Sequence, residues 1–298
     1  MKIKHLPWVI FLMAVLACRF SASDSTPAPA ADRTPAINGA TPESAPLDAD
    51  ANLTILADPG GRVAWLFSQN LIAFDKPDSD GYYDIYSMEL DGSAKTCLTC
   101  SSTLRLHNGD PAWHPSGEYI AFSARDESLG EPPALPGNFS SFPGTGVHNN
   151  IWVMAANGGQ YWQITRVEDG HGTLHPIFSP DGKKLLWSEI VTPGRTLGGS
   201  WTLKIADFSI ENGDAVVSNI RTMTPLYLRF YGSHEFSADG KFITFAGIKD
   251  GGNLLDLEIY TTDLISGETI QLTNSQAWDE HPHYTPDGKS IIWVSSMD

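Results

Sequence analysis

Four stretches of the sequence repeat one pattern: a short strand, a tight turn that ends in glycine, and a second strand of alternating apolar residues. They are DPAWHPSGEYIAFSA (110–124), HPIFSPDGKKLLWSE (175–189), SHEFSADGKFITFAG (233–247) and HPHYTPDGKSIIWVS (281–295). The turn is Pro-Asp-Gly or a near variant, which suits a hairpin with glycine at the position that needs a positive φ. The pattern therefore predicts a series of related antiparallel hairpins.

Each repeated hairpin is followed by two further strand-like segments. The first segments are 84–92, 150–158, 203–213 and 257–267, and the second are 95–99, 161–165, a weaker 217–224, and 269–273. A degenerate hairpin at 62–76 precedes the first of them. Four antiparallel strands per repeated unit are the signature of a β-propeller blade, and blades must stack because one blade alone leaves its apolar faces exposed. We therefore expect an all-β protein, a propeller of about four and a half to five four-stranded blades.

These segments resemble the TolB-type propeller repeat, a WD-like family. The stretches that carry the resemblance best are FSPDGKKLLW (178–187) and NIWVMAANGGQYWQIT (150–165). The resemblance extends over about residues 62–298 and implies the fold, with the propeller domain taken as 51–298. It implies less about activity, because such propellers serve both as binding platforms and as parts of enzymes.

The N-terminus has the three-part pattern of an export signal. Lys2 and Lys4 precede an apolar run from Leu6 to Ala17, which is too short to span a bilayer comfortably. The run closes on VLAC, which resembles the bacterial lipobox and implies that Cys18 is lipidated; ordinary cleavage a few residues later, after Ser23, is the alternative. Residues 19–50 are rich in Ala, Pro and Ser and are expected to form a disordered linker. We therefore expect an exported protein, anchored by lipid in a bacterial cell envelope with the domain facing the periplasm or the cell surface.

Charge and cysteine content exclude several classes of partner. The net charge of −16, from 35 acidic and 19 basic residues, argues against a nucleic-acid partner and against adhesion to an anionic membrane by charge alone. Cys97 and Cys100 lie two residues apart in TCLTCSS and are expected to form a small disulfide loop after export. They follow a strand, whereas redox catalysis favours a helix N-terminus, and no second ligand pair of similar spacing exists for zinc.

Two insertions and several histidines fall on one predicted face of the propeller. The insertions, 125–149 and 190–201, are expected to be long loops of the kind that carry binding sites. Four histidines stand at the start of the innermost strands near the channel mouth, and two more lie in the loops before such strands: His175, His234, His281, His283, His107 and His171. Each of them could equally make only structural hydrogen bonds.

The pair His281 and His283 also permits a metal-binding interpretation. Residues two apart in a strand point to the same side, so both imidazoles could reach one ion. The stretch HPHYTPDGK (281–289) resembles oligogalacturonate lyases, and that resemblance implies a manganese site with His234 as a third ligand. Trp278 stands where the lyase pattern has a glutamine, so the match is broken there.

The interpretation we favour is a binding module rather than an enzyme, with no metal or other cofactor. It would recognise a protein, a peptide or a glycan through the channel face, with His175, His234, His281 and His283 as the candidate binding residues. The alternatives are a polysaccharide lyase that depends on manganese or a similar divalent ion, and a structural module of an envelope assembly.

The last repeat predicts an open end. It has the hairpin at 279–298 but neither of the two outer strands, so we expect a bare two-stranded end and a chain that is a piece of a longer propeller. The segment 52–58 could instead supply an outer strand and close a five-bladed ring.

Replacing Cys18 by Ser should release the protein into the soluble fraction, because the substitution removes the only predicted site of lipid attachment. Membrane fractionation and the intact mass of the wild-type protein check this. A variant that stays with the membrane, together with a wild-type mass without acyl groups, would contradict lipidation.

Overall fold

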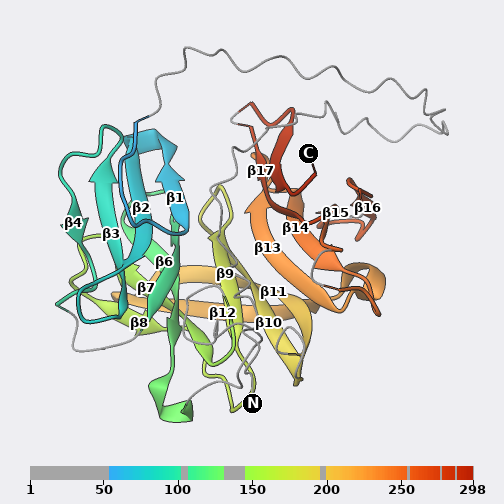
Figure 1. Cartoon of the computed structure of the whole chain (residues 1–298). Helices are drawn as coiled ribbons and strands as arrows, with labels where there is room; N and C mark the ends of the chain where they lie inside the picture. The colour runs from blue at the N-terminus through green and yellow to red at the C-terminus, as the bar shows by residue number, and fades with distance from the viewer. Residues whose placement is uncertain are drawn as a thin grey trace, which may run out of the picture.

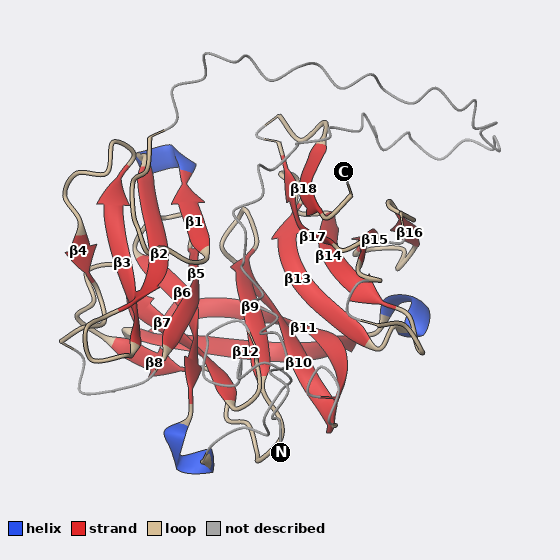
Figure 2. Cartoon of the chain, in the orientation of Figure 1, coloured by secondary structure: helices blue, strands red, loops and turns tan. Residues whose placement is uncertain are grey.

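The computed structural model describes residues 54–101, 107–130, 145–194, 199–253, 256–275, 277–285 and 287–297. These residues form an all-β protein, in which the only helices are short 3₁₀ turns of three residues each (Figure 2). No helix in these ranges is long and apolar enough to cross a membrane.

Four sheets have four antiparallel strands each, and a fifth has two. The first blade contains β1 (Val63–Leu66), β2 (Leu71–Pro77), β3 (Tyr83–Glu89) and β4 (Thr96–Cys97). The second contains β5 (Asn108–Trp113), β6 (Tyr119–Arg125), β7 (Asn149–Ala155) and β8 (Tyr161–Gln163). The third contains β9 (Thr173–Phe178), β10 (Lys184–Pro193), β11 (Gly199–Glu211) and β12 (Asp214–Met223). The fourth contains β13 (Phe230–Phe236), β14 (Phe242–Ile248), β15 (Glu258–Asp263) and β16 (Thr269–Gln271), and the last sheet contains β17 (Asp279–Tyr284) and β18 (Ile291–Ser295).

The sheets follow one another around a common axis in chain order (Figure 1). The first strands of successive sheets, β1, β5, β9, β13 and β17, contact one another and form the inner wall. The arrangement is that of a propeller with four complete blades and a fifth sheet of two strands, which confirms the predicted fold.

The repeated turns adopt the predicted conformation. Gly117, Gly182, Gly240 and Gly288 all have positive φ, at 75°, 69°, 69° and 68°. Each follows the first strand of its sheet and reverses the chain into the second strand. Glycine adopts this conformation without the steric cost that a Cβ atom would add, which is why the repeat ends its turn in glycine.

The core is a set of apolar layers between neighbouring blades. The layer between the second and third blades combines residues of both sheets: Ala112, Ala121, Ile151, Val153, Phe178, Leu185, Trp187, Ala206 and Phe208. A corresponding layer joins the first and second blades, and a larger one joins the third, the fourth and the two-stranded sheet. Each fully buried large side chain contributes roughly 1.5–3 kcal/mol, so the blades stabilise one another.

Two predicted segments differ from expectation. The described parts of the second insertion, residues 190–194 and 199–201, mostly extend β10 and β11, and Ile190 and Trp201 pair across the strands and are both buried. Residues 195–198 lie outside the described residues. The segment at 52–58 supplies no outer strand in its described part, residues 54–58. Instead, Leu56 and Ala57 pack on the free face of the first blade beside Phe74 and Tyr86, so side-chain cover replaces strand pairing there.

The last sheet consists of the hairpin β17–β18, with no third strand among the described residues. This matches the expected two-stranded end. Asp279 and Ile291 of this hairpin are nevertheless buried, because β17 packs against β13, β14 and β15 of the fourth blade.

Two of the turn glycines offer a matched test of how the turns depend on the neighbouring blade. A Cβ atom on Gly182 would lie 2.3 Å from Nε2 of His114, whereas the nearest atom to a Cβ on Gly240 would be 3.9 Å away. Both glycines have a φ of 69°, so both alanine variants should lose roughly 1–2 kcal/mol from backbone strain. The Gly182→Ala variant should lose more, because the His114 ring is held between Ser116 and the Gly182 carbonyl. Urea unfolding of the two variants measures the difference, and equal losses would show that contact with His114 imposes no constraint.

Candidate functional site

The inner strands of the last four sheets share one irregularity, a β-bulge at their midpoint. In β5, β9, β13 and β17 one extra residue interrupts the pairing with the following strand. The bulges lie at Asp110-Pro111, His175-Pro176, His234 and His281-Pro282. Bulges redirect side chains and are common next to functional sites.

The local sequence explains the bulges. Asp110, His175 and His281 have positive φ values of 52°, 51° and 56°, a conformation that Asp and His tolerate better than β-branched residues. In each case the next residue is proline, which lacks the N–H group that regular pairing would require. The dipeptide Asp-Pro or His-Pro, placed seven residues before the turn glycine, is therefore the sequence signal for the bulge.

The bulges bring three histidines together from three different sheets. The ring centroids of His175 and His234 lie 5.0 Å apart, and those of His234 and His281 are also 5.0 Å apart. The rings of His175 and His281 are separated by 6.2 Å, which closes the triangle. We call His175, His234 and His281 the histidine cluster. His283 lies at its edge, with its ring 6.3 Å from that of His234.

Two carboxylates adjoin the histidine cluster. An oxygen of Glu280 lies 3.6 Å from Nε2 of His281, and an oxygen of Glu235 lies 3.5 Å from Nδ1 of His283. Because a bulge separates His281 from His283, the regular alternation that would place both imidazoles on one side is interrupted. The two histidines accordingly pair with different carboxylates.

An acidic pair with one arginine lies on the first two blades. Arg62 forms two hydrogen bonds with Asp75, at 2.7 and 2.9 Å, and its Nε lies 3.0 Å from Asp110. The backbone N–H of Asp110 donates to the Asp75 carboxylate at 2.9 Å, so Asp75 is bound both by Arg62 and by the main chain of the second blade. Gly61 permits this approach, because a Cβ atom there would overlap the Asp75 carboxylate.

Burial shifts the pKa of most of these groups in the direction that favours the uncharged form. Burial lowers the pKa of His175 and of His281 to about 3, and that of His234 well below its usual value. Burial raises the pKa of Asp75 to about 6, against the opposing effect of Arg62, and raises that of Glu280 to about 7 with help from Asp110. The histidine cluster is therefore neutral at neutral pH, and the carboxylates are costly to ionise without a cationic partner.

The histidine cluster does not meet the geometry of a preformed metal site. Within the described ranges, a single group of three potential ligands has its donor atoms all within 4.8 Å of one another, and it consists of Asp84, Cys97 and Cys100. The two cysteines form a disulfide. A metal bound by His234, His281 and His283 would thus require the side chains to move together first.

The remaining predicted residues lie away from the cluster. His107 stacks on Tyr82 with ring centroids 4.9 Å apart. His171 lines a pocket of about 410 Å³ between the second and third blades, together with Arg166, Trp187 and Lys204. Cys18 and residues 131–144 of the first insertion lie outside the described residues.

Sequence reasoning missed five members of the site: Arg62, Asp75, Asp110, Glu235 and Glu280. Only Asp110 had a usable signal, because it precedes a proline seven residues before Gly117, as His175 does before Gly182. Glu235 and Glu280 are sequence neighbours of His234 and His281, and Arg62 and Asp75 are opposed in the predicted hairpin at 62–76, but no repeated pattern marks any of the four as site residues.

No family model matches the chain. An uncharacterized protein of Agrobacterium fabrum is 38% identical over 63 residues, which are 21% of this chain and 20% of that protein. The uncharacterized peptidase YuxL of Bacillus subtilis is 25% identical over 63% of this chain and 22% of its own length. The Tol-Pal system protein TolB of Francisella tularensis is 25% identical over 38% of this chain and 23% of its own length. The chain thus spans less than a quarter of each of these relatives.

Solved structures of TolB proteins share the fold. TolB from Acinetobacter baumannii superposes with a TM-score of 0.55 at 20% identity, over 80% of this chain and 55% of that one. A putative TolB from Agrobacterium tumefaciens gives the same TM-score at 15% identity, over 78% of this chain and 72% of that one. These likenesses confirm the predicted TolB-like propeller.

The buried, neutral state of His234 leads to a prediction about pH. His234 is 4% exposed, and its pKa is lowered on folding, so its contribution to stability is present above its ordinary pKa of 6.5 and is lost as the pH falls below it. Asp75 and Glu280 act in the opposite sense, because their raised pKa values favour the folded state as the pH falls. The wild-type profile is therefore a sum of opposing effects, and a variant isolates the histidine.

Replacing His234 by Gln should cost less stability at about pH 5.5 than at about pH 7, by roughly 1 kcal/mol, because Gln has no proton to bind in the unfolded state. Urea unfolding at the two pH values measures the difference. Ser233→Ala, a neighbouring change without a titratable group, should cost the same at both. An equal cost of His234→Gln at both pH values would contradict a histidine held neutral by burial.

Proposed function

We propose that this chain is an exported β-propeller module, anchored through Cys18, that binds a protein, peptide or glycan at the histidine cluster. The proposal rests above all on one observation, the convergence of three bulged inner strands that place His175, His234 and His281 within one triangle. A scaffold that needed only stability would gain nothing from a buried His234 with two partly buried imidazoles beside it, since burying polar groups is costly.

Two of these imidazoles have unused hydrogen-bonding capacity. Nδ1 of His175 and Nε2 of His234 are buried, and neither has a hydrogen-bond partner in the described part of the chain. Buried polar atoms are normally paired, and an unpaired one costs about 1–3 kcal/mol. A ligand that supplies amide or hydroxyl groups would satisfy both atoms.

The charges around the cluster favour one kind of ligand. Glu280, Glu235, Asp75 and Asp110 adjoin the cluster, and among the described residues the basic group in contact with two of them is that of Arg62. An ammonium or guanidinium group would stabilise the ionised forms of Asp75, Asp110 and Glu280, which burial disfavours. A protein segment with Lys or Arg therefore fits the site better than an uncharged glycan.

The fold and the N-terminal sequence support an envelope location. The propeller is similar to that of TolB proteins, one of which is described as part of a Tol-Pal system. The segment before residue 19 has the features of an export signal with a lipobox. A general protein-binding role agrees with both.

The histidines keep one second candidate open, a polysaccharide lyase that depends on manganese or a similar divalent ion. His234, His281 and His283 are neighbours, as a shared ion would require. Their donor atoms do not meet the distance expected of a preformed site, so we expect metal analysis of the purified protein to find little bound ion. Near-stoichiometric manganese that is lost when both His281 and His283 are replaced would favour the lyase.

Peptide and glycan arrays, probed with the Cys18→Ser protein, test the binding function. We expect basic peptides to bind, and the double variant His234→Ala/His281→Ala to bind them at least about tenfold more weakly, since it removes well-packed central contacts. His171→Ala is the matched control, because it removes a histidine outside the cluster. Binding that is unchanged in the double variant, or lost equally in the control, would contradict recognition at the cluster.

A further inference from the structure

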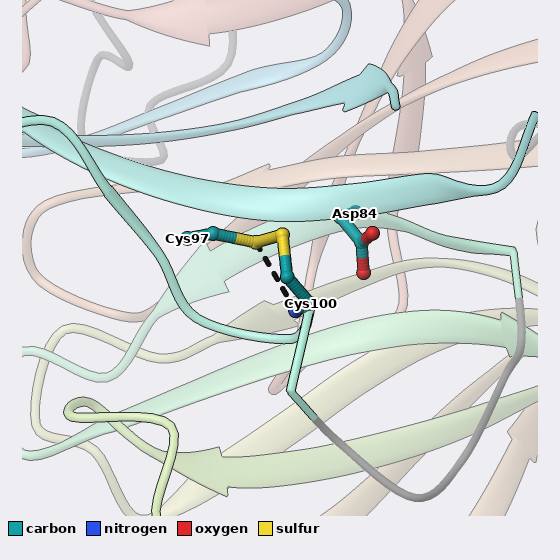
Figure 3. A group of neighbouring side chains, drawn as sticks. All are labelled: Asp84, Cys97 and Cys100. Carbon is teal, nitrogen blue, oxygen red and sulfur yellow. Dashed lines mark hydrogen bonds between the residues drawn. A yellow bond between two sulfur atoms is a disulfide. The ribbon is translucent and has the colours of Figure 1, made fainter. Parts of the chain in front are cut away.

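The first blade contains a second group of potential ligands, far in the fold from the histidine cluster. The sulfur atoms of Cys97 and Cys100 and a carboxylate oxygen of Asp84 all lie within 4.8 Å of one another (Figure 3). Asp84 belongs to β3, Cys97 ends β4, and Cys100 lies in the turn that follows. The sequence contains no second cysteine pair that could complete a zinc site, but folding brings the Asp84 carboxylate beside Cys97 and Cys100.

The Asp84 carboxylate is held in position by its surroundings. Asp84 is 7% exposed, and the Thr99 hydroxyl donates to its Oδ1 at 2.5 Å. The N–H of Ile85 donates in turn to Thr99, and the side chain of Asn108 also hydrogen-bonds to Asp84. Metal ligands are typically oriented by such supporting hydrogen bonds.

A second carboxylate lies beside this group. Oδ2 of Asp78 lies 3.6 Å from the sulfur of Cys100 and accepts a hydrogen bond of 3.2 Å from the Tyr86 hydroxyl. The set of donors within 4.8 Å of one another is therefore the two sulfur atoms and the Asp84 oxygen, and the Asp78 carboxylate lies outside that set, beside Cys100.

The chemistry of the set depends on the state of the two cysteines. In the disulfide they carry no charge and bind metal weakly, whereas thiolates are strong ligands for zinc. Two thiolates beside two carboxylates would repel one another unless a cation lay between them. Zn–S bonds of about 2.3 Å and Zn–O bonds of about 2.0–2.2 Å place tetrahedral ligands roughly 3.3–3.8 Å apart, a spacing that the group can reach once the disulfide opens.

We propose that reduction of the Cys97–Cys100 disulfide creates a site for a thiophilic divalent ion such as Zn²⁺, with Cys97, Cys100 and Asp84 as its ligands. A dithiol or phosphine reductant supplies two electrons and, with solvent, two protons; the S–S bond breaks and two thiols form while the reductant is oxidised. Binding of the ion then displaces both thiol protons to solvent. The disulfide is the closed form of the site and excludes the ion.

Cobalt is a suitable probe, because Co²⁺ bound to thiolates has a ligand-to-metal charge-transfer band in the near ultraviolet. The experiment uses the full chain with Cys18→Ser, so that the third cysteine contributes no ligand. The protein is reduced with a phosphine, freed of reductant and titrated with Co²⁺, then with Zn²⁺ as competitor. We expect one equivalent of Co²⁺ to produce the band in the reduced protein alone, and Zn²⁺ to abolish it.

Variants assign the ligands. The double variant Cys97→Ser/Cys100→Ser should abolish the band, and Asp84→Asn should weaken Co²⁺ binding by about tenfold or more. Asp91→Asn is the control, because it removes an exposed carboxylate outside the group and should leave Co²⁺ binding unchanged. Circular dichroism of each oxidised variant verifies folding. The comparison of oxidised with reduced protein needs no variant at all. A band in the oxidised protein, no band in the reduced protein, or undiminished affinity in a folded Asp84→Asn variant would each overturn the proposal.

Discussion

Burial of apolar surface between neighbouring blades is the interaction on which the rest of this structure depends. A four-stranded sheet has two faces, and each face needs cover if its side chains are apolar. Trp187 and Phe178 of the third blade are covered by Ile151 and Val153 of the second, and comparable layers lie on either side. On the outer face of the first sheet, Leu56 and Ala57 supply this cover among the described residues. The channel residues can tolerate unfavourable burial because these layers, and not the channel, hold the blades together.

The bulged inner strands convert this scaffold into a site. A regular strand would alternate its side chains between the two apolar layers and leave little for the axis. One extra residue per strand redirects a polar side chain at the same height in successive sheets, which is why Asp110, His175, His234 and His281 converge although they are distant in sequence. The bulge interrupts regular β-pairing at one place in each inner strand, and it recurs in four sheets. A feature that costs stability and recurs at one place is better explained by function than by folding.

Much of the fold was predictable from sequence, because the hairpins depend on local signals. Glycine in the turn and apolar alternation in the strands identify each unit, and the predicted units match the four complete blades and the final hairpin. The site was predictable only in part. His175, His234 and His281 stand at repeated positions. Asp75 lies on β2 and meets Arg62 across the hairpin of the first blade, whereas it meets Asp110 only through packing of the second blade on the first. The spacing of the turn glycines predicts an insertion at 190–201 and hence a loop, but burial of Ile190 and Trp201 favours longer strands at both ends of that insertion. The approach of Asp84 to Cys97 and Cys100 likewise depends on how β3 pairs with β4, which the spacing of the cysteines does not reveal.

The electrostatics of the axis narrow the choice of ligand further than the hydrogen bonds do. Neutral imidazoles accept or donate equally well, so His175 and His234 alone would suit a sugar hydroxyl as readily as a peptide amide. The carboxylates, in contrast, distinguish a cationic ligand from an uncharged one. Glu280 has a pKa of about 7 because burial and the nearby Asp110 both oppose its ionisation, and Arg62 is already engaged by Asp75 and Asp110. An uncharged glycan would leave that repulsion in place, whereas a cationic side chain would relieve it and gain a charge-assisted hydrogen bond in a partly desolvated position. The same carboxylates would repel an anionic polysaccharide unless a divalent ion intervened, so a lyase acting on such a substrate would depend on its metal for binding as well as for chemistry.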